Sequence, residues 1–181
     1  MDFYLQRLHD AISSATEGMN PEMLGRRPQA GKWCAAEVLE HLYLTYTGTI
    51  KGVERCIAAG GPLARGRTLN DRMRTALVVS IGYMPGGRQA PQNAMPRGIA
   101  ANRVLGEFSE KICSMDAVIS QAEEKFGSDV PLMDHPILGP LRPCQWRKFH
   151  WVHGMHHLKQ LQRLRQKFEL RANNDTHQGH L

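Results

Sequence analysis

Three long stretches of the chain carry apolar residues at helical spacing, and each ends at glycine, proline or a polar run. They cover about 33–59, 103–126 and 144–172, and a shorter stretch of the same kind covers 2–17. Residues that recur every three or four positions share one face of an α-helix, which glycine or proline interrupts. No segment shows the apolar–polar alternation of a half-buried strand. The pattern predicts an all-α four-helix bundle whose three long helices pack roughly antiparallel.

The segment 60–102 is expected to form a long irregular crossover between the second and third long helices. Only 69–82 fits a short helix, because the stretch MPGGRQAPQNAMPRG contains too many prolines and glycines for a long regular element. Such an excursion often forms the wall or lid of a functional site, although it can also be only a connection. We expect a single domain over 1–172 and a flexible polar tail over 173–181.

The formal net charge is +6, which allows either an anionic partner or a solvated basic helix face. No helix-turn-helix, RNA-binding or zinc-finger spacing accompanies the charge, so nucleic acid is not the expected partner. The longest apolar run, at 76–84, is too short to span a bilayer, and no membrane partner is expected. Four dispersed cysteines without a CxxC pair fit reduced thiols in a cytoplasm. Much of the positive charge lies in 147–171, at Arg147, Lys148, Lys159, Arg163, Arg165, Lys167 and Arg171.

The stretch WVHGMHHLKQ at 151–160 holds three histidines within five positions. His153 and His157 are four residues apart, so on a helix both face the same side and can turn their ring nitrogens toward one metal ion. His156 lies about 100° further around the helix, whereas Gln160 returns to the side of His157. Alone, this spacing is also typical of surface or interfacial histidines.

A third ligand would have to come from another helix, and His41 is the candidate. A stripe of small and polar residues on its helix face would leave space for a ligand beside the helix. Alternatively, the glycines allow two helices to approach closely, and His41 is a half-buried structural histidine. Composition favours neither interpretation. The residues that share this face are Cys34, Glu37, Thr45, Gly48 and Gly52.

The segments GKWCAAEVLEHL, HPILGPLRPCQW and HWVHGMHHLKQL together resemble the DinB-like superfamily of four-helix bundles. The resemblance is strongest to the branch with HP-x-x-G-x-L-x-x-x-x-W before the last helix. It runs from about Trp33 to Leu164 and weakens over 60–100. It implies a metal-binding triad of His41, His153 and His157, and a homodimer. One departure is Arg142, which stands before Pro143 where a Thr, Ser or Asp would cap the last helix, so the start of that helix is open.

Three neutral imidazoles around a divalent ion leave a coordination position open, as in catalytic metal sites. A water bound there can be acidified to near pH 7, or a thiol can bind as thiolate. Some relatives resemble thiol-dependent S-transferases, which join a low-molecular-weight thiol to an electrophile. We therefore expect a metal-dependent thiol S-transferase or hydrolase-like enzyme. The alternative is a non-enzymatic metal- or ligand-binding dimer.

Zinc or nickel is the favoured ion, although imidazoles also suit copper and iron. Its affinity is expected to fall as the pH drops through the imidazole range near 6.5. Glu37 is the one acidic residue that the spacing puts near His41, and no protein general base is expected.

Other histidines receive different roles. His150, one turn before His153, is expected to line the same pocket or to orient a ligand. His135 is expected to fix the turn before the last helix. His9 is assigned to the surface, and His177 and His180 to the tail.

Overall fold

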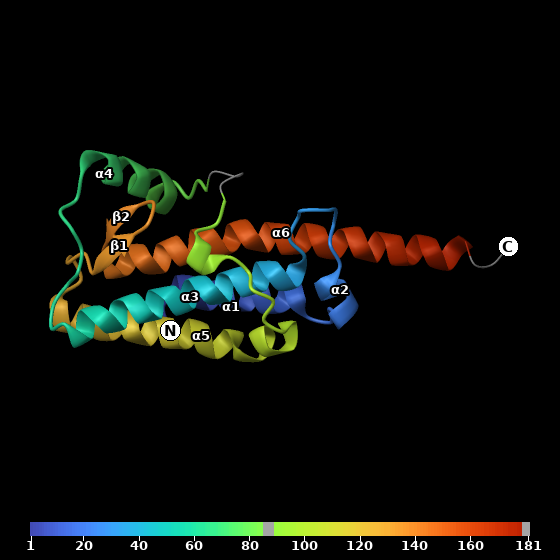
Figure 1. Cartoon of the computed structure of the whole chain (residues 1–181), viewed down its shortest axis with the longest axis horizontal. Helices are drawn as coiled ribbons and strands as arrows, with labels where there is room; N and C mark the ends of the chain where they lie inside the picture. Colours follow the sequence, from blue (N-terminus) through green and yellow to red (C-terminus); the bar gives the residue numbers. More distant parts are fainter. Residues whose placement is uncertain (85–88, 179–181) are drawn as a thin grey trace.

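The computed structural model describes residues 1–84 and 89–178, with the backbone alone over 170–178. Four helices lie along the long axis of the molecule: α1 (Phe3–Thr16), α3 (Ala35–Ala58), α5 (Ala101–Phe126) and α6 (Pro143–Gln178) (Figure 1). The mostly helical architecture expected from the sequence is confirmed. The shorter elements are α2 (Pro21–Gly25), α4 (Leu69–Thr75), the π-helical turn η1 (Ala76–Ser80), the 3₁₀ turn η2 (Gln92–Ala94), β1 (Met133–His135) and β2 (Gly139–Leu141).

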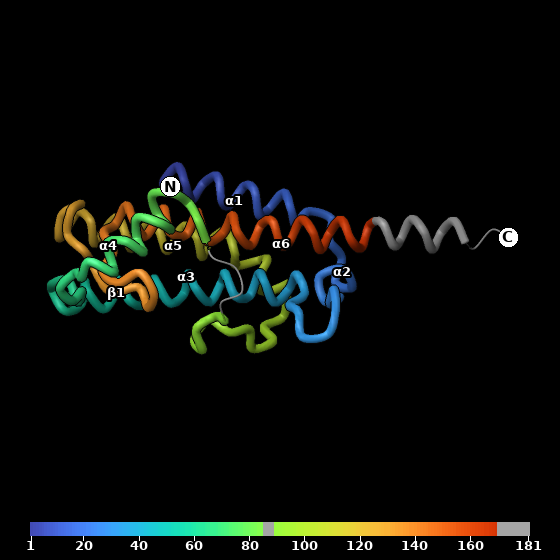
Figure 2. The backbone as a smooth tube through the Cα atoms, turned by 90° about the horizontal axis from the view of Figure 1, so that it is seen from above, coloured from blue at the N-terminus to red at the C-terminus, as the bar shows by residue number. Residues whose placement is uncertain are grey.

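The long helices do not all alternate in direction. In Figure 1, α1 and α6 run one way and α3 and α5 run the other way. The expectation that the three long helices are mutually antiparallel is therefore wrong for α3 and α5, which are parallel neighbours. The reason is the crossover between them, which returns the chain to the end of the molecule where α3 began. The first part of the crossover packs on the other side, with α4 against β2 and η1 against α6. The part that follows residue 88 lies along the outer side of α3 (Figure 2).

Apolar residues from all four long helices form one continuous core. α1 packs mainly against α6, and α3 packs mainly against α5. Gly154 of α6 lies where α1 crosses, because a Cβ added there would come within 2.3 Å of Cδ1 of Leu8. Within the described part of the chain, no helix has the length and apolar character needed to cross a membrane. The fully buried core residues include Leu5, Leu8, Leu39, Leu42, Tyr46, Ile112, Met115, Ile119 and Leu161.

A small hairpin precedes α6, in a segment expected to be a loop. β1 and β2 are antiparallel, with Met133 opposite Leu141 and His135 opposite Gly139. Nδ1 of His135 accepts hydrogen bonds from the backbone N–H groups of Ile137 and Leu138, so His135 does fix this turn. Strands of three residues are too short to show a periodic pattern, which explains why the sequence did not reveal them.

The start of α6 is resolved at Pro143, directly after Arg142. The backbone N–H of Arg142 donates to Oε1 of Gln145, a partial substitute for the missing cap, and the Arg142 side chain pairs with Asp129. The helix continues to Gln178, beyond the expected end near 172. Residues 179–181, which include His180, lie outside the described residues, and the tail at 173–181 stays a prediction.

The basic residues of α6 are not all on a solvated face. Arg147 is buried and bonds to Asp116, Glu123 and Ser120 of α5. Arg165 donates to the carbonyl groups of Ser14 and Ala15 at the end of α1. These contacts fix α6 against its neighbours and thereby hold the histidine segment in place.

Candidate metal centre

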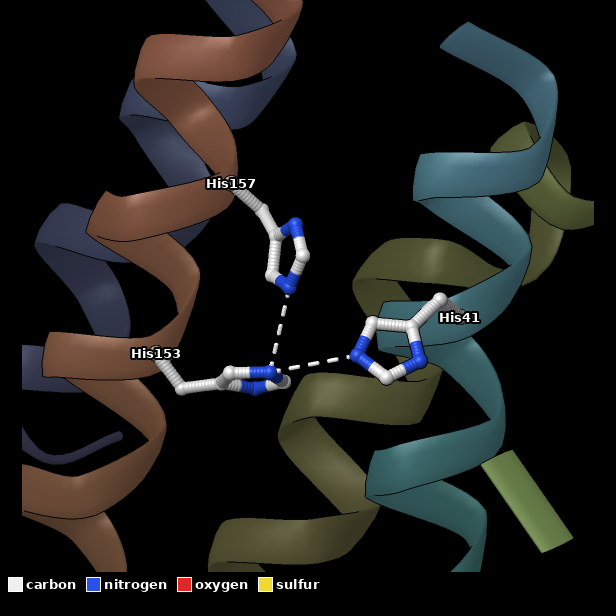
Figure 3. Close-up of side chains that lie close together, drawn as sticks. All are labelled: His41, His153 and His157. Carbon is white, nitrogen blue, oxygen red and sulfur yellow. Dashed lines mark hydrogen bonds between the residues drawn. The ribbon is translucent and has the colours of Figure 1, made fainter. Parts of the chain in front are cut away.

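His41, His153 and His157 converge although more than a hundred residues separate the first from the others. α3 presents His41, and α6 presents His153 and His157 on one face (Figure 3). Nε2 of His153 lies 3.2 Å from Nε2 of His41 and 3.2 Å from Nε2 of His157. The nearest ring nitrogens of all three lie within 4.8 Å of one another. The structure thus brings together the three residues that the sequence singled out.

Two of the three rings are held by acceptors on the side away from the cluster. Nδ1 of His41 lies 2.8 Å from the carbonyl oxygen of Ala94, and Nδ1 of His157 lies 3.2 Å from Oε1 of Gln160. Since these oxygens only accept, the hydrogen-bond network assigns the proton of each neutral ring to Nδ1. Nε2 of His41 and Nε2 of His157 then both face the cluster with a lone pair.

The protons available cannot satisfy both contacts of His153. Its Nε2 can donate one hydrogen at most, to His41 or to His157, so the other nitrogen–nitrogen contact is not a hydrogen bond. A cation between the three nitrogens would satisfy all of the lone pairs together. Two ligands at zinc–nitrogen bond lengths in tetrahedral geometry lie about 3.3 Å apart, close to the 3.2 Å separations observed. The donor set fits a divalent metal ion.

Burial keeps the cluster neutral. Loss of hydration lowers the pKa of His41, lowers that of His153 well below the ordinary value, and lowers that of His157 to about 3. The bond to Ala94 partly opposes this shift for His41. These lowered pKa values favour proton competition with a metal at a lower pH than the range near 6.5 of a free imidazole. The pH dependence of metal binding itself stays a prediction.

Aromatic rings fix the orientation of the imidazoles. Phe149 stacks on His153 with ring centroids 5.4 Å apart and an interplanar angle of 9°. Trp33, just before α3, lies against both His41 and His157, at 5.1 and 6.5 Å. These rings restrict the space in which the three imidazoles can turn.

A cavity of about 880 Å³ opens beside the cluster and includes all three histidines in its wall. Thr45, Gly48, Thr49 and Gly52 line it along α3, and the crossover supplies the opposite wall. A Cβ on Gly48 would meet nothing within 4 Å, whereas one on Gly52 would lie 2.2 Å from Sδ of Met133. Gly48 thus leaves open space beside the helix, as the first interpretation expected, whereas Gly52 makes room for a side chain of β1 and not for a second helix.

The neighbouring histidines have other roles. His150 is fully buried outside the cluster, and its Nε2 bonds to Oγ1 of Thr49 at 3.0 Å. Burial lowers the pKa of His150 to about 3 and that of His135 to about 4. His156 lies edge-on against His157 and lines the cavity, but it is not among the converging ligands.

Glu37 does not reach the cluster. Its carboxylate accepts from the backbone N–H of Cys34 at the start of α3 and pairs with Arg27. It is thus committed to capping the helix. Glu40, which the sequence did not indicate, is buried and accepts from the backbone N–H groups of Arg97 and Gly98.

Glu40 and the Ala94 carbonyl together connect the crossover to the cluster. One turn of α3 thereby holds the crossover at two points: His41 bonds to the end of η2, and Glu40 bonds to the backbone after it. No sequence signal identifies Ala94, because any residue offers a carbonyl there. The one feature of the sequence near this contact is an acidic residue, Glu40, directly before His41. Helical spacing alone does not reveal that His41 has a backbone partner more than fifty residues away.

Comparison with known proteins places the chain in a family. It is 26% identical over 166 residues to "Uncharacterized protein YuaE" of Bacillus subtilis (strain 168), a match that covers 84% of this chain and 90% of that protein. No solved structure matches the chain. Residues 3–164, which include all three clustered histidines, match the family described as "Protein of unknown function (DUF1569)", and the chain belongs to this family.

Proposed function

We propose that the protein binds one divalent metal ion through Nε2 of His41, His153 and His157. The observation that carries the proposal is the meeting of three imidazole nitrogens with too few protons to bond to one another. Zinc or nickel is the proposed ion, because three neutral imidazoles suit either. The test is elemental analysis of protein purified without a histidine tag or a nickel column. About one equivalent of a transition metal per chain is expected, and a metal-free protein that also fails to bind added zinc would refute the proposal.

A second proposal concerns the type of helical bundle. We infer that the chain is a DinB-like four-helix bundle, with α1, α3, α5 and α6 as its helices. The support is the resemblance of three segments to that superfamily, together with the parallel pair α3 and α5 and the long crossover between them. In such bundles metal sites are built in the interior from side chains on facing helices, as His41 on α3 faces the pair on α6.

The cavity favours an enzyme over a purely structural metal site. Its volume lies in the range of small-molecule sites, and the histidines form part of its wall. An ion held by three protein ligands supplies an open coordination position and lowers the pKa of what binds there. We propose that the substrates are a low-molecular-weight thiol and an electrophilic small molecule, although a hydrolase-like reaction would use the same open position.

In the S-transfer reaction, the thiol proton leaves to solvent, sulfur forms a bond to the electrophilic carbon, and the leaving group departs with the electron pair of its bond. The chain's residues position the groups for this step. Gln160 and the Ala94 carbonyl orient two of the imidazoles, and Trp33 and Phe149 pack against the rings and limit their rotation.

The competing function is a metal- or ligand-binding module without a reaction. The two differ in one observation: the joint loss of a thiol and an electrophile in the presence of the metal-loaded protein. Loss that disappears in the His157→Ala variant would favour the enzyme. No loss above the metal-free control across a panel of thiols and electrophiles would favour the module.

We also propose a homodimer, on the strength of the resemblance. Sedimentation at micromolar concentration should give about twice the chain mass of 20.4 kDa, and a clean monomer would exclude it. A cytoplasmic location remains a prediction from the cysteine content.

A further inference from the structure

The outer face of α4 and η1 carries large apolar side chains that nothing in the described structure covers. Leu69, Met73 and Ile81 are 73%, 64% and 73% exposed, and Leu77 between them is 39% exposed. They follow one another at intervals of four residues. The opposite side of the same segment is buried through Asp71, Thr75, Val78 and Val79. We call Leu69, Met73, Leu77 and Ile81 the apolar stripe.

The π-helical turn keeps the apolar stripe straight. In an α-helix each step of four residues advances about 40° beyond a full turn, so four such positions would wind around the helix. η1 instead forms the longer hydrogen bonds of a π-helix, such as Ile81 N–H to the carbonyl of Ala76. Its wider turn, about 4.4 residues, reverses the drift over Leu77 and Ile81. The four side chains of the stripe therefore stay on one side of the segment and do not wind around it.

The charges beside the stripe are positive. Residues 60–84 contain four arginines and a single acidic residue, Asp71. Asp71 is buried and held by Arg65 and Thr68, so it offers no negative charge at the surface. Arg72 and Arg74 are exposed on the two flanks of the stripe. This segment thus has an apolar centre and a cationic rim, the pattern of helices that lie in the interface of an anionic membrane.

A second copy of the chain fits this surface less well. Two-fold pairing through the stripe would place the arginines of both copies close together, with no exposed carboxylate of the segment to pair with them. A stable interface also takes roughly 20–30 residues a side, far more than the stripe provides. An interfacial helix needs only a few buried apolar side chains and attraction to anionic headgroups.

We propose that α4 and η1 dock the protein on the surface of an anionic lipid bilayer, with the apolar stripe inserted among the acyl chains at the headgroup boundary. This revises the expectation of no membrane partner, which considered only spanning segments. Leu77 also lines the cavity beside the histidines, as do Arg74 and Val78. Docking would therefore bring one wall of the cavity to the membrane surface, where apolar molecules concentrate.

The test is co-sedimentation of the full chain with vesicles, either of phosphatidylcholine alone or of phosphatidylcholine with a third of phosphatidylglycerol. We expect binding to the anionic vesicles only, weakened by added salt. The double variant Leu69→Ser/Ile81→Ser should lose at least tenfold in affinity. Arg72→Gln/Arg74→Gln should lose about thirtyfold, whereas the matched change Lys159→Gln/Arg163→Gln on α6 should lose clearly less.

Two readouts keep the test independent of folding and of the metal. Circular dichroism should be the same for all variants, because every substituted side chain is exposed. Binding should not depend on added zinc, so failure of the metal proposal leaves this one intact. Equal binding to neutral and anionic vesicles, no binding to either, or equal losses for the α4 and α6 charge variants would overturn the proposal. So would conversion of a dimer to a monomer by Leu69→Ser/Ile81→Ser without lipid, because the stripe would then bind a second copy.

Discussion

Two glycine-to-alanine changes, one on α6 and one on α3, should shift stability in opposite directions. In Gly154→Ala the new Cβ would lie 2.3 Å from Cδ1 and 2.7 Å from Cδ2 of Leu8. Leu8 is fully buried, so its methyl groups have no free space to move into, and α1 must shift. Overpacking of this kind costs about 1–3 kcal/mol, and the gain in helix propensity returns about 1 kcal/mol. We expect a net loss of roughly 1–2 kcal/mol.

Gly48→Ala is the matched control. The change in helix propensity is the same, but the new Cβ meets nothing within 4 Å because it enters the cavity. The free energy of unfolding should rise by about 0.5–1 kcal/mol. Urea unfolding of both variants and the wild type, followed by circular dichroism, measures the difference. If Gly154→Ala were as stable as Gly48→Ala, the close packing of α1 on the histidine segment would be wrong.

Three further predictions concern the surroundings of the cluster. The metal-free protein should lose stability as the pH falls below about 6.5, because the folded state holds His150 and His135 neutral, with pKa values of about 3 and 4, while the unfolded chain takes up their protons. The expected slope is up to about 1.4 kcal/mol per pH unit for each histidine, levelling off near pH 4 for His135 and near pH 3 for His150, and equal urea midpoints at pH 7 and pH 5 would contradict it. Gln160→Leu removes the acceptor of His157 Nδ1 and should weaken zinc binding about 10–100-fold in a chelator competition, whereas Gln162→Leu on the exposed side of α6 should leave it unchanged. Glu40→Gln replaces one of the two accepting oxygens with an NH2 group, so the N–H of either Arg97 or Gly98 loses its acceptor. The change should destabilise the protein by about 1–3 kcal/mol and speed proteolysis near residues 90–98; cleavage at the wild-type rate would count against this tether.

The sequence predicted the helices well because each long helix has a strong apolar period and a clear stop. Helix α3 was expected at 33–59 and is found at Ala35–Ala58, and α5 was expected at 103–126 and is found at Ala101–Phe126. The sequence also indicated that His41, His153 and His157 share one site. In this case helical spacing accounts for the pair on α6, and the resemblance accounts for the partner on α3.

What the sequence did not reveal depends on contacts between distant segments. The hairpin at 133–141 is too short for a period, and the parallel arrangement of α3 and α5 follows from the path of an irregular crossover. The π-helical turn at Ala76–Ser80 continues an apolar helical pattern, so the sequence does not distinguish it from an α-helix. The Ala94 carbonyl and the pKa shifts of the histidines arise only when the chain is folded.

The central claim is that three histidines, and not a general histidine-rich surface, bind the metal. It is tested most directly by the zinc affinities of His41→Ala, His153→Ala, His157→Ala and His156→Ala, each titrated as metal-free protein against a chromophoric chelator at pH 7. Because loss of an outer hydrogen-bond partner already costs 10–100-fold, loss of a ligand should cost roughly a hundredfold or more for the first three variants. His156→Ala should stay within about threefold of the wild type, since His156 lies outside the converging set. Equal losses for His156→Ala and His157→Ala, or wild-type affinity in His41→Ala, would contradict the account.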